Sequence, residues 1–472
     1  MAVYVFSLLT GFFTGGVDYA QGTRQNYLKK MNIPVKYIYT SVPNERDLLV
    51  YEQLGIDTKS MLVAPFFLSG KKEIGSPDQI RKKDIFSRGY LIAREHYAGD
   101  LMYTDYFVPV KEKDVWEAKL TKRTFRNPEG QVVFDIIIDE KGDERYWYPN
   151  GENLSKQEFL CRFIQKLNLT KEDIVLIDRP GLSEFVQPLF MYGNKAKIVV
   201  FFHSVHYAQP GEAAEFAYLN YHYYYWFKNS DKIHTIIVST EAQKLEVIEK
   251  LKEYGCQIPN MEVIPICGLD KIRIPSGERK PYSLVTASRF VPGKKIDWII
   301  RSVIKAHEKN PKVNLDIYGE GSVANTGILR GIIEEHHAQD YVHFMGHQNM
   351  KERYTGYEAY ISASLGESFG LTLLDAAGSG EALIGLDAKY GNHVFIKNGE
   401  NGYLADVDFS KTGNAQYVET VIQGMADKIV ELFADEQRLQ EFHEKSYEIA
   451  EEYMEYKIEK RWIDFIEKNI KE

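Results

Sequence analysis

Two acidic residues stand close together in the segment GESFGLTLLDAAGSG, which spans residues 366–380. Glu367 follows a predicted strand, Ser368-Phe369-Gly370 forms the turn, and Asp375 lies on the next helix. Their spacing covers slightly more than two helical turns, so both carboxylates can face one cleft. Carboxylates accept hydrogen bonds from vicinal hydroxyls, which indicates contacts to a sugar and to a ribose. The alternative, a helix-terminal acid and an ordinary surface Asp, leaves the turn unexplained.

A basic loop follows another predicted strand. In ASRFVPGKK (287–295), Arg289 comes just after the strand, and Lys294 and Lys295 follow a Pro-Gly turn. A fixed guanidinium and a mobile ammonium near a helix N-terminus form a good diphosphate clamp. The alternative interpretation is a solvated basic loop.

A glycine pair lies between the first predicted strand (Val3–Leu9) and a helix from about Asp18. Gly15 and Gly16 allow the backbone to approach a ligand, and the following helix N-terminus favours an anion. A tight turn without a ligand is the alternative. Because no basic residue precedes this apolar stretch, we expect a buried strand rather than a signal peptide.

Two histidines follow the predicted strand KIVVFFH (197–203) in the segment HSVHY. His203 ends the strand, which places it at the cleft, although a structural histidine that caps a strand is the alternative. His206 lies three residues further on. Since no carboxylate or Cys joins it locally, we do not expect a metal site.

Two α/β series must position these residues. Apolar strands alternate with helices at both ends of the chain, which predicts parallel sheets covered on both faces. We expect an N-terminal Rossmann-like domain (1–60 and 151–278) and a C-terminal one (279–450), with a final helix (451–472) that returns to the first. Ligands of such folds bind beyond the carboxyl ends of the strands.

The stretch 61–150 has a different pattern. Its β-rich runs are separated by NPEG at 127–130 and EKGD at 140–143, which are good hairpin connectors. Pro109 inside one run predicts an edge or a break. We expect an inserted antiparallel sheet that extends the surface for an acceptor or a partner protein.

The chain has 472 residues, too many for one hydrophobic core. Its 58 Lys and Arg against 67 Asp and Glu give a formal net charge of −9, which disfavours nucleic acid as a partner. The three cysteines are too scattered for a disulfide framework and indicate a reducing compartment. No stretch approaches the ~20 apolar residues that cross a bilayer. We expect a cytoplasmic protein, with peripheral association at the inner face of the membrane as an option.

Together these segments resemble the retaining glycosyltransferases of the GT-B fold in the family commonly numbered four. IYGEG (317–321) and YGNHVFIKNGENGYL (390–404) match as well, and the similarity spans nearly the whole chain. GVDYAQGTR, KPYSLVTASR and the β-rich insert look most like the catalytic subunits that add N-acetylglucosamine to serine-rich surface adhesins before accessory-Sec export. The resemblance implies an α/β fold of two doubly wound Rossmann-like domains with a cleft between them.

The resemblance also implies roles. Arg289 and Lys294 would bind the donor diphosphate, Glu367 the donor sugar and Asp375 the ribose, while His203 would reach the sugar from the other domain. The candidate catalytic residues are Glu367, His203, Arg289 and Lys294, and the candidate substrate-binding residues add Gly15, Gly16, His206, Ser368, Phe369, Gly370, Leu371 and Asp375. The donor would be a UDP-sugar, with UDP-GlcNAc expected, and no metal or other cofactor is implied.

Two positions depart from the family pattern. Asp375 is one methylene shorter than the usual Glu, which predicts a weaker ribose contact, and Glu381-Ala382 stands where Leu-Pro is frequent.

Three functions remain open from the sequence: transfer to Ser/Thr of a serine-rich protein, transfer to a polyol-phosphate teichoic acid, and a non-catalytic binding subunit. Basic residues of the insert (Lys119, Lys122, Arg123 and Arg126) would suit a polyanionic teichoic acid. The resemblance implies a homologous, non-catalytic partner subunit.

Overall fold

The computed structural model describes residues 1–6, 16–53, 55–71, 79–112, 114–178, 184–207 and 219–471. The predicted glycine loop is affected, because Gly15 lies outside these residues while Gly16 begins a helix. Three sheets are present in the described part of the chain, two of them parallel and one antiparallel.

The first parallel sheet consists of short strands in the order β14-β13-β12-β11-β1-β2-β3, of which β11 and β13 are completely buried and the edge strand β14 is partly exposed. The interior strand β1 pairs in parallel with the central strand β11 and with β2, as the apolar runs predict. Its strands are β1 (Val3–Phe6), β2 (Val35–Tyr39), β3 (Met61–Val63), β11 (Ile174–Ile177), β12 (Lys197–Phe201), β13 (Thr235–Val238) and β14 (Asn260–Val263).

The helices that alternate with these strands are mostly short. They are α1 (Gly16–Lys30), α2 (Glu45–Gln53), α3 (Ala64–Leu68), α4 (Lys156–Leu167), α5 (Val186–Tyr192), α6 (Tyr221–Lys228) and α7 (Glu241–Glu253). Helix α4 begins with a capping box in which Ser155 and Glu158 satisfy each other's backbone N–H groups.

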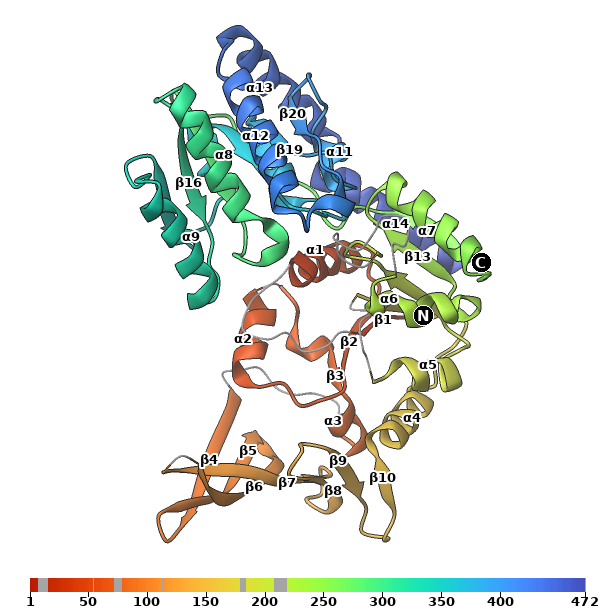
Figure 1. Cartoon of the computed structure of the whole chain (residues 1–472). Helices are drawn as coiled ribbons and strands as arrows, with labels where there is room; N and C mark the ends of the chain where they lie inside the picture. The colour runs from red at the N-terminus through yellow and green to blue at the C-terminus, as the bar shows by residue number, and fades with distance from the viewer. Residues whose placement is uncertain are drawn as a thin grey trace. The chain divides into compact units, whose positions relative to one another are not determined.

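The predicted insert is a seven-stranded antiparallel sheet in the order β10-β9-β8-β7-β6-β5-β4, and α4 lies beside β9 and β10 (Figure 1). Both predicted connectors are tight turns with a left-handed glycine, Gly130 and Gly142. The strands are β4 (Ile80–Ser87), β5 (Tyr90–Ala98), β6 (Asp100–Glu112), β7 (Val115–Arg126), β8 (Val132–Ile138), β9 (Glu144–Trp147) and β10 (Asn153–Ser155).

Pro109 lies inside β6 without breaking it. It pairs with Ala118 of β7, whereas the pairing of β6 with β5 stops at Tyr106. Pro109 therefore lies at a local edge of the sheet, where no neighbouring strand needs a hydrogen bond from the N–H that proline lacks. The antiparallel sheet begins at Ile80 rather than near residue 61. Met61–Val63 belongs to the first parallel sheet, because it pairs in parallel with β2.

The second parallel sheet has the order β17-β16-β15-β18-β19-β20. The chain runs outward from β15 to β17 on one side and then returns to add β18 on the other, so the strand order reverses between β15 and β18. The strands are β15 (Lys280–Ala287), β16 (Asn314–Tyr318), β17 (Val342–Gly346), β18 (Tyr357–Ile361), β19 (Ala382–Leu386) and β20 (Gly402–Ala405).

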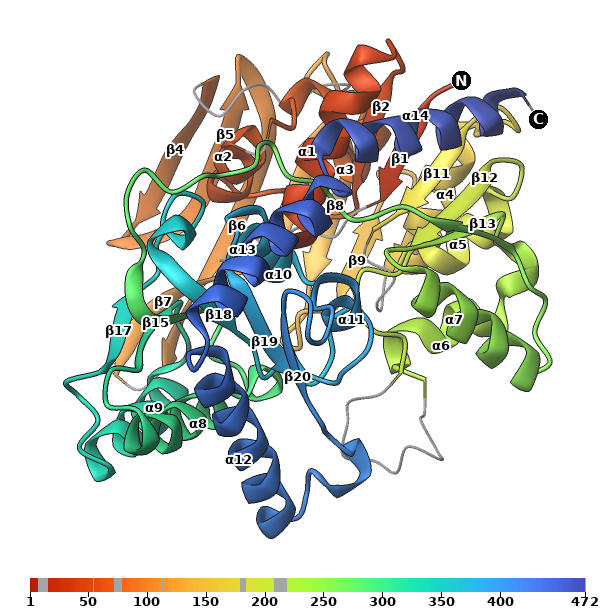
Figure 2. The same ribbon diagram turned by 90° about the horizontal axis from the view of Figure 1, so that it is seen from above.

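Long amphipathic helices cover this second sheet. Helices α8 and α12 pack on one another, and α10 and α13 lie side by side (Figure 2). These helices are α8 (Ile296–Lys309), α9 (Val323–Glu335), α10 (Leu371–Gly378), α11 (Gly391–Phe395), α12 (Ala415–Leu432) and α13 (Glu436–Glu451). The last helix, α14 (Glu455–Lys471), instead reaches the first parallel sheet, where Lys197 of β12 donates to the carbonyl oxygen of Asn469. None of the described helices is long and apolar enough to span a membrane.

The chain forms two compact units. Unit 1 comprises Met1–Phe201, Asn229–Ile236 and Ile466–Glu472, and unit 2 comprises Phe202–Lys228 and Ile237–Phe465. Unit 1 thus holds the antiparallel sheet, and unit 2 holds the whole of the second parallel sheet. The division into domains that the sequence predicts runs at other bounds and stays a prediction.

Candidate functional site

The candidate site of unit 2 lies where the strand order reverses, since loops from the carboxyl ends of β15 and β18 meet there. Arg289 follows β15 and is exposed. Its neighbours are fixed, because the N–H groups of Ser288 and Phe290 donate to the carbonyl oxygens of Tyr318 and Glu320 at 3.1 and 2.8 Å. A Cβ on Gly319 would lie 1.8 Å from the carbonyl oxygen of Ser288, so only glycine permits this approach.

Lys294 and Glu367 form an ion pair that joins these two loops. The Lys294 ammonium also lies 3.5 Å from the Ser364 hydroxyl. The backbone repeats the connection, because the N–H of Leu365 donates to the carbonyl of Gly293 at 3.2 Å. Both charged side chains remain partly exposed, at 26% and 18%, so solvent or a ligand can reach the pair.

The turn after Glu367 presents an uncapped helix N-terminus. Helix α10 begins directly after Gly370, which has a φ of 92°, and no side chain caps its first turn. Backbone N–H groups of that turn lack intrahelical acceptors and therefore favour an anion. Phe369 takes no part in the surface, since its ring is buried 5.1 Å from that of Phe395.

The segment after β12 packs against the same turn within unit 2. The Ser368 hydroxyl donates to the backbone carbonyl of His203 at 2.5 Å. The backbone of His203 therefore lies against the turn that carries Ser368 and Glu367, and the predicted substrate contact of its side chain stays a prediction. His203 is itself only partly buried.

His206 occupies a different environment from His203. Its side chain is 1% exposed, and burial lowers its pKa to about 4, so the ring is neutral near pH 7. Its Nδ1 lies 3.4 Å from the hydroxyl of Tyr390, which donates to Glu246 at 2.6 Å. His206 therefore lies behind the site, and the predicted substrate contact of this residue stays a prediction.

Tyr390 and Glu246 are residues that sequence reasoning missed. Tyr390 is fully buried, and its N–H donates to the carbonyl of Glu367 at 2.7 Å, which supports the turn at Glu367 from behind. The YGN segment matches the family pattern, but nothing in the sequence indicates that Tyr390 supports the turn at Glu367. Nothing in the sequence predicts a role for Glu246, because it is one of several polar residues on the amphipathic helix α7.

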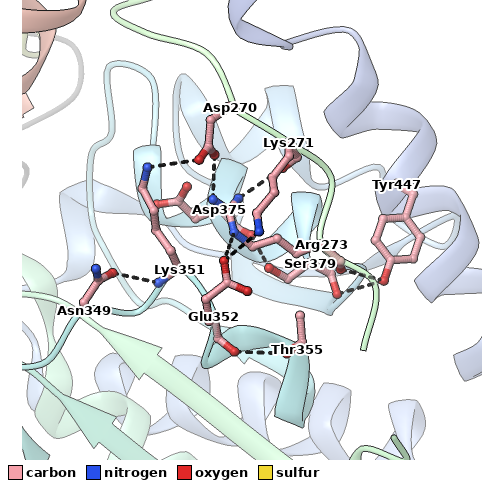
Figure 3. Close-up of polar contacts among 10 residues, drawn as sticks. All are labelled: Asp270, Lys271, Arg273, Asn349, Lys351, Glu352, Thr355, Asp375, Ser379 and Tyr447. Atoms are coloured by element: carbon pink, nitrogen blue, oxygen red, sulfur yellow. Dashed lines mark hydrogen bonds and ion pairs between the residues drawn. The ribbon is translucent and has the colours of Figure 1, made fainter. Parts of the chain in front are cut away.

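Asp375 lies in a separate cluster of charged side chains (Figure 3). Arg273, whose side chain is 2% exposed, pairs with Asp270 at 2.6 Å and with Glu352 at 3.5 Å, and Lys351 pairs with Asp270 at 3.5 Å. Burial raises the pKa of Asp375 to about 6, against the opposing effect of Arg273 and Lys351. The two acids of the motif therefore have different cationic neighbours. Sequence reasoning named none of these partners.

Two family models match the chain: Glycosyl transferases group 1 over residues 270–448 and the GtfA extended beta-sheet domain over residues 67–150. The GtfA subunit of UDP-N-acetylglucosamine–peptide N-acetylglucosaminyltransferase from Streptococcus gordonii is 32% identical over 99% of this chain and 98% of its own length. A poly(ribitol-phosphate) alpha-N-acetylglucosaminyltransferase from Staphylococcus aureus is 27% identical over 73% of this chain and 68% of its own.

Two solved structures resemble the whole chain. The pneumococcal O-GlcNAc transferase GtfA in complex with UDP and GlcNAc has a TM-score of 0.81 at 30% identity and covers 100% of this chain and 99% of its own. A GtfA/B complex has a TM-score of 0.82 at 30% identity and covers 100% of both chains. These similarities confirm the predicted GT-B fold class, in which an antiparallel extension is added to two Rossmann-like parts.

Proposed function

Because this chain belongs to the family of GtfA subunits of UDP-N-acetylglucosamine–peptide N-acetylglucosaminyltransferases, we propose that it transfers N-acetylglucosamine from UDP-GlcNAc to Ser and Thr hydroxyls of a serine-rich protein. The chain is a glycosyltransferase, and the transfer retains the configuration of the sugar. One observation carries the proposal: the Lys294–Glu367 pair beside the uncapped start of α10, with Arg289 on the neighbouring loop.

Charge compensation is the first task of this site. The donor diphosphate brings negative charge, and more charge develops on it as the bond to the sugar breaks. Arg289 offers a planar fork for bidentate contacts, and Lys294 adds a mobile ammonium. The free N–H groups at Leu371 and the following residues add fixed dipoles. The leaving phosphate then takes the proton of the acceptor hydroxyl.

Glu367 and Asp375 would recognise the sugar and the nucleotide of the donor. Glu367 lies at the carboxyl end of β18, where the reacting sugar is expected, and its carboxylate accepts hydrogen bonds from sugar hydroxyls. His203, whose backbone contacts the neighbouring Ser368, would add a second polar group. Asp375 lies on α10 and would accept the ribose hydroxyls. Gly16, at the start of α1, would give the donor a close approach to backbone N–H groups.

The acceptor is a protein rather than a teichoic acid in this proposal. A polyanion would need free cations on the antiparallel sheet, but the four basic residues of the insert that would suit it already have partners. Lys122 pairs with Asp135 at 3.6 Å and Arg123 with Asp105 at 2.6 Å. Lys119 and Arg126 donate to backbone carbonyl oxygens.

A homologous subunit is the expected partner, because a relative of this chain is known in a GtfA/B complex. The exposed rings and aliphatic side chains of the antiparallel sheet suit such a contact. All three cysteines are free, which agrees with a reducing, cytoplasmic compartment.

The proposal is tested with a panel of radiolabelled nucleotide sugars and two acceptors, a serine-rich peptide and a ribitol-phosphate polymer. We expect label from UDP-GlcNAc on the peptide, with and without the partner subunit as separate arms. Label on the polymer alone would assign the teichoic-acid function. No hydrolysis or transfer with any donor would assign a non-catalytic subunit.

Metal dependence gives an independent prediction. Activity should survive excess EDTA, because Arg289 and Lys294 supply the positive charge. The chain does contain an Asp-x-Asp triplet, Asp406-Val407-Asp408, but Asp408 caps the turn Phe409–Lys411 and pairs with Lys411 at 2.7 Å. Activity that EDTA abolishes and Mn²⁺ restores would contradict the assigned clamp.

A further inference from the structure

Arg273 is a buried cation of the cluster around Asp375, and the proposed transfer gives it no task. Its side chain is 2% exposed, and its Nη2 donates a hydrogen bond to Asp270 at 2.6 Å. Its Nη1 donates to the carbonyl oxygen of Lys271 at 3.1 Å, and its Nε lies 3.5 Å from the carboxylate of Glu352. A guanidinium loses hydration free energy when it is buried, so such a position needs compensating carboxylates. Arg273 is therefore a fixed charge rather than a mobile surface side chain.

Backbone contacts tie Arg273 to the helix that carries Asp375. The N–H of Arg273 donates to the carbonyl oxygen of Gly378, the last residue of α10, at 2.8 Å. The carbonyl oxygen of Arg273 accepts a hydrogen bond from the hydroxyl of Tyr447 at 3.2 Å. Gly378 follows Asp375 by three residues, so the two are neighbours on one face of the helix. The charge of Arg273 is thus held at a set place near Asp375 (Figure 3).

The charges of this cluster balance only when Asp375 is ionised. The charged side chains of Figure 3 are three cations and three acids, namely Lys271, Arg273, Lys351, Asp270, Glu352 and Asp375. Burial opposes the charge of Asp270, but the hydrogen bond from Arg273 outweighs burial and holds the pKa of Asp270 below its usual value. The hydrogen bond from Lys271 lowers the pKa of Glu352. These two acids are therefore charged at pH 7, and one positive charge is left for Asp375.

The groups that face Asp375 act on its charge in opposite directions. Burial raises its pKa to about 6, Arg273 and Lys351 oppose that rise, and the charge of Asp270 adds to it. Burial also raises the pKa of two further neighbours above their usual values and keeps them uncharged at pH 7, namely Cys267 and Tyr354. Without the two cations, Asp375 would be largely protonated at pH 7.

We propose that Arg273, assisted by Lys351, is a positioning residue for the donor ribose and holds Asp375 as a carboxylate in front of the ribose hydroxyls. The inference rests on the proposed function, in which Asp375 accepts hydrogen bonds from these hydroxyls. An ionised carboxylate accepts from both hydroxyls, and its charge-assisted bonds are stronger than those to a neutral acid. Arg273 acts through Asp375 and needs no contact with the nucleotide. It therefore sets the lowest pH at which the site selects a ribonucleotide.

The test compares the binding of UDP with that of 2′,3′-dideoxy-UDP, by calorimetry on the full chain between pH 5 and pH 8.5. The two nucleotides share the base and the diphosphate, so the ratio of their dissociation constants cancels the titration of the phosphate and reports the ribose hydroxyls. We expect the unchanged chain to prefer UDP by at least about tenfold at pH 8 and by less than about threefold at pH 5. The midpoint of this change should lie near pH 6, because the pKa of Asp375 is about 6.

This comparison separates the inference from the proposed function. If UDP does not bind at any pH, the UDP-sugar site is wrong, and the inference is wrong with it. If UDP binds but the ratio is the same from pH 5 to pH 8.5, the nucleotide site stands and only the role of Arg273 and Asp375 is overturned.

Substitutions of Arg273 test the residue itself. Arg273→Gln removes the charge and keeps a hydrogen-bond donor. It should raise the midpoint by about one pH unit or more, because a nearby opposite charge lowers the pKa of an acid by that amount. Arg273→Lys keeps the charge and should bring the midpoint back to within about half a unit of the unchanged chain. A merely structural role would weaken both nucleotides equally at every pH, so an unchanged midpoint in Arg273→Gln overturns the inference.

Two lysines of the same cluster provide a control and a second test. Lys271→Gln is the matched control, because it loses an ion pair with Glu352 at 3.0 Å, but the charge of Lys271 is not one of those that shift the pKa of Asp375. Its midpoint should stay near pH 6. Lys351→Gln removes a partly exposed cation and should raise the midpoint by less than Arg273→Gln. If Arg273→Gln does not fold, Lys351→Gln decides the question, and equal midpoints in the Lys351 and Lys271 variants overturn the inference.

Discussion

At the scale of single residues, the two acids of the 366–380 motif differ in their partners. Glu367 contacts Lys294 and lies at the turn that precedes α10, whereas Asp375 lies near Arg273 and Lys351 on the helix itself. A group beside the reacting sugar gains strength as charge develops, but a group on the ribose binds ground state and transition state alike. The two residues should therefore affect different kinetic parameters.

Glu367→Gln should lower kcat by about a hundredfold, which corresponds to about 2.7 kcal/mol of lost transition-state stabilisation. Asp375→Asn should mainly raise the KM for the donor, and Asp375→Glu should lower that KM by restoring the reach of the longer acid. Steady-state kinetics with varied UDP-GlcNAc measure both parameters for the three variants. A large fall in kcat for Asp375→Asn with Glu367→Gln nearly unaffected would reverse the assignment.

The pH dependence of donor binding should follow Asp375. Its pKa is raised to about 6, so the carboxylate is charged at pH 7.5 and mostly protonated at pH 5. A protonated acid accepts fewer hydrogen bonds from the ribose, so the KM for the donor should rise as the pH falls through 6. The profile of Asp375→Asn should be high and flat over this range. A wild-type KM that stays constant from pH 7.5 to 5 would contradict the ribose contact.

At the scale of secondary-structure elements, local signals were sufficient for most of the fold. The apolar run Ile174–Ile177 is a parallel strand because its side chains are buried on both faces, and the Asn-Pro-Glu-Gly sequence at 127–130 forms the turn that its glycine permits. The two loops that carry Arg289 and Glu367 were also predictable, since each follows a strand.

The supporting contacts of the site were not predictable in the same way. Tyr390 lies 144 positions from Glu246, and Arg273 lies 79 positions from Glu352, so nothing in their local sequence indicates these pairs. Their burial depends on how distant segments pack. From the sequence alone, Glu246 could equally be a solvent-exposed residue on the polar face of its helix.

The antiparallel sheet gives a prediction at this scale. Phe86 and Trp116 are 61% and 54% exposed, and the ring of Trp116 lies 5.3 Å from that of Tyr90. If this face binds the acceptor or the partner subunit, Phe86→Ser with Trp116→Ser should reduce transfer to the protein acceptor at least fivefold and leave hydrolysis of UDP-GlcNAc unchanged. Val323→Ser is a suitable control, because Val323 is an exposed apolar residue of unit 2. Unchanged transfer would remove this role from the sheet.

At the scale of the whole molecule, Glu381 should lower the stability of the fold near neutral pH. The residue is fully buried, and neither of its carboxyl oxygens has a hydrogen-bond partner among the described residues. Burial raises its pKa well above the ordinary value, with only partial compensation from Arg279, so the folded protein keeps the acid neutral. The unfolded chain ionises it above about pH 4.3. Unfolding therefore becomes more favourable as the pH rises from 5 to 8.

Glu381→Gln should remove that pH dependence. We expect a higher midpoint of thermal unfolding at pH 8, on the order of 1–3 kcal/mol of added stability, and a small change at pH 5. The exposed Glu335 supplies the control substitution to Gln, which should have no effect at either pH. A Glu381→Gln variant that gains as much at pH 5 as at pH 8 would show that the acid is ionised in the folded state.

The division of the chain between the two units also has a consequence for synthesis on the ribosome. The second parallel sheet is complete once Ala405 has emerged, so most of unit 2 can fold on the nascent chain. Unit 1 includes the first strand and also residues 466–472, which are translated after all of unit 2. At about 5–20 residues per second, on the order of half a minute to a minute and a half separates the synthesis of the first strand from that of this last segment. The strands that pair with β1, which are β2 and β11, are both translated by Ile177, so what waits for this segment is its own packing on unit 1 rather than the pairing of β1.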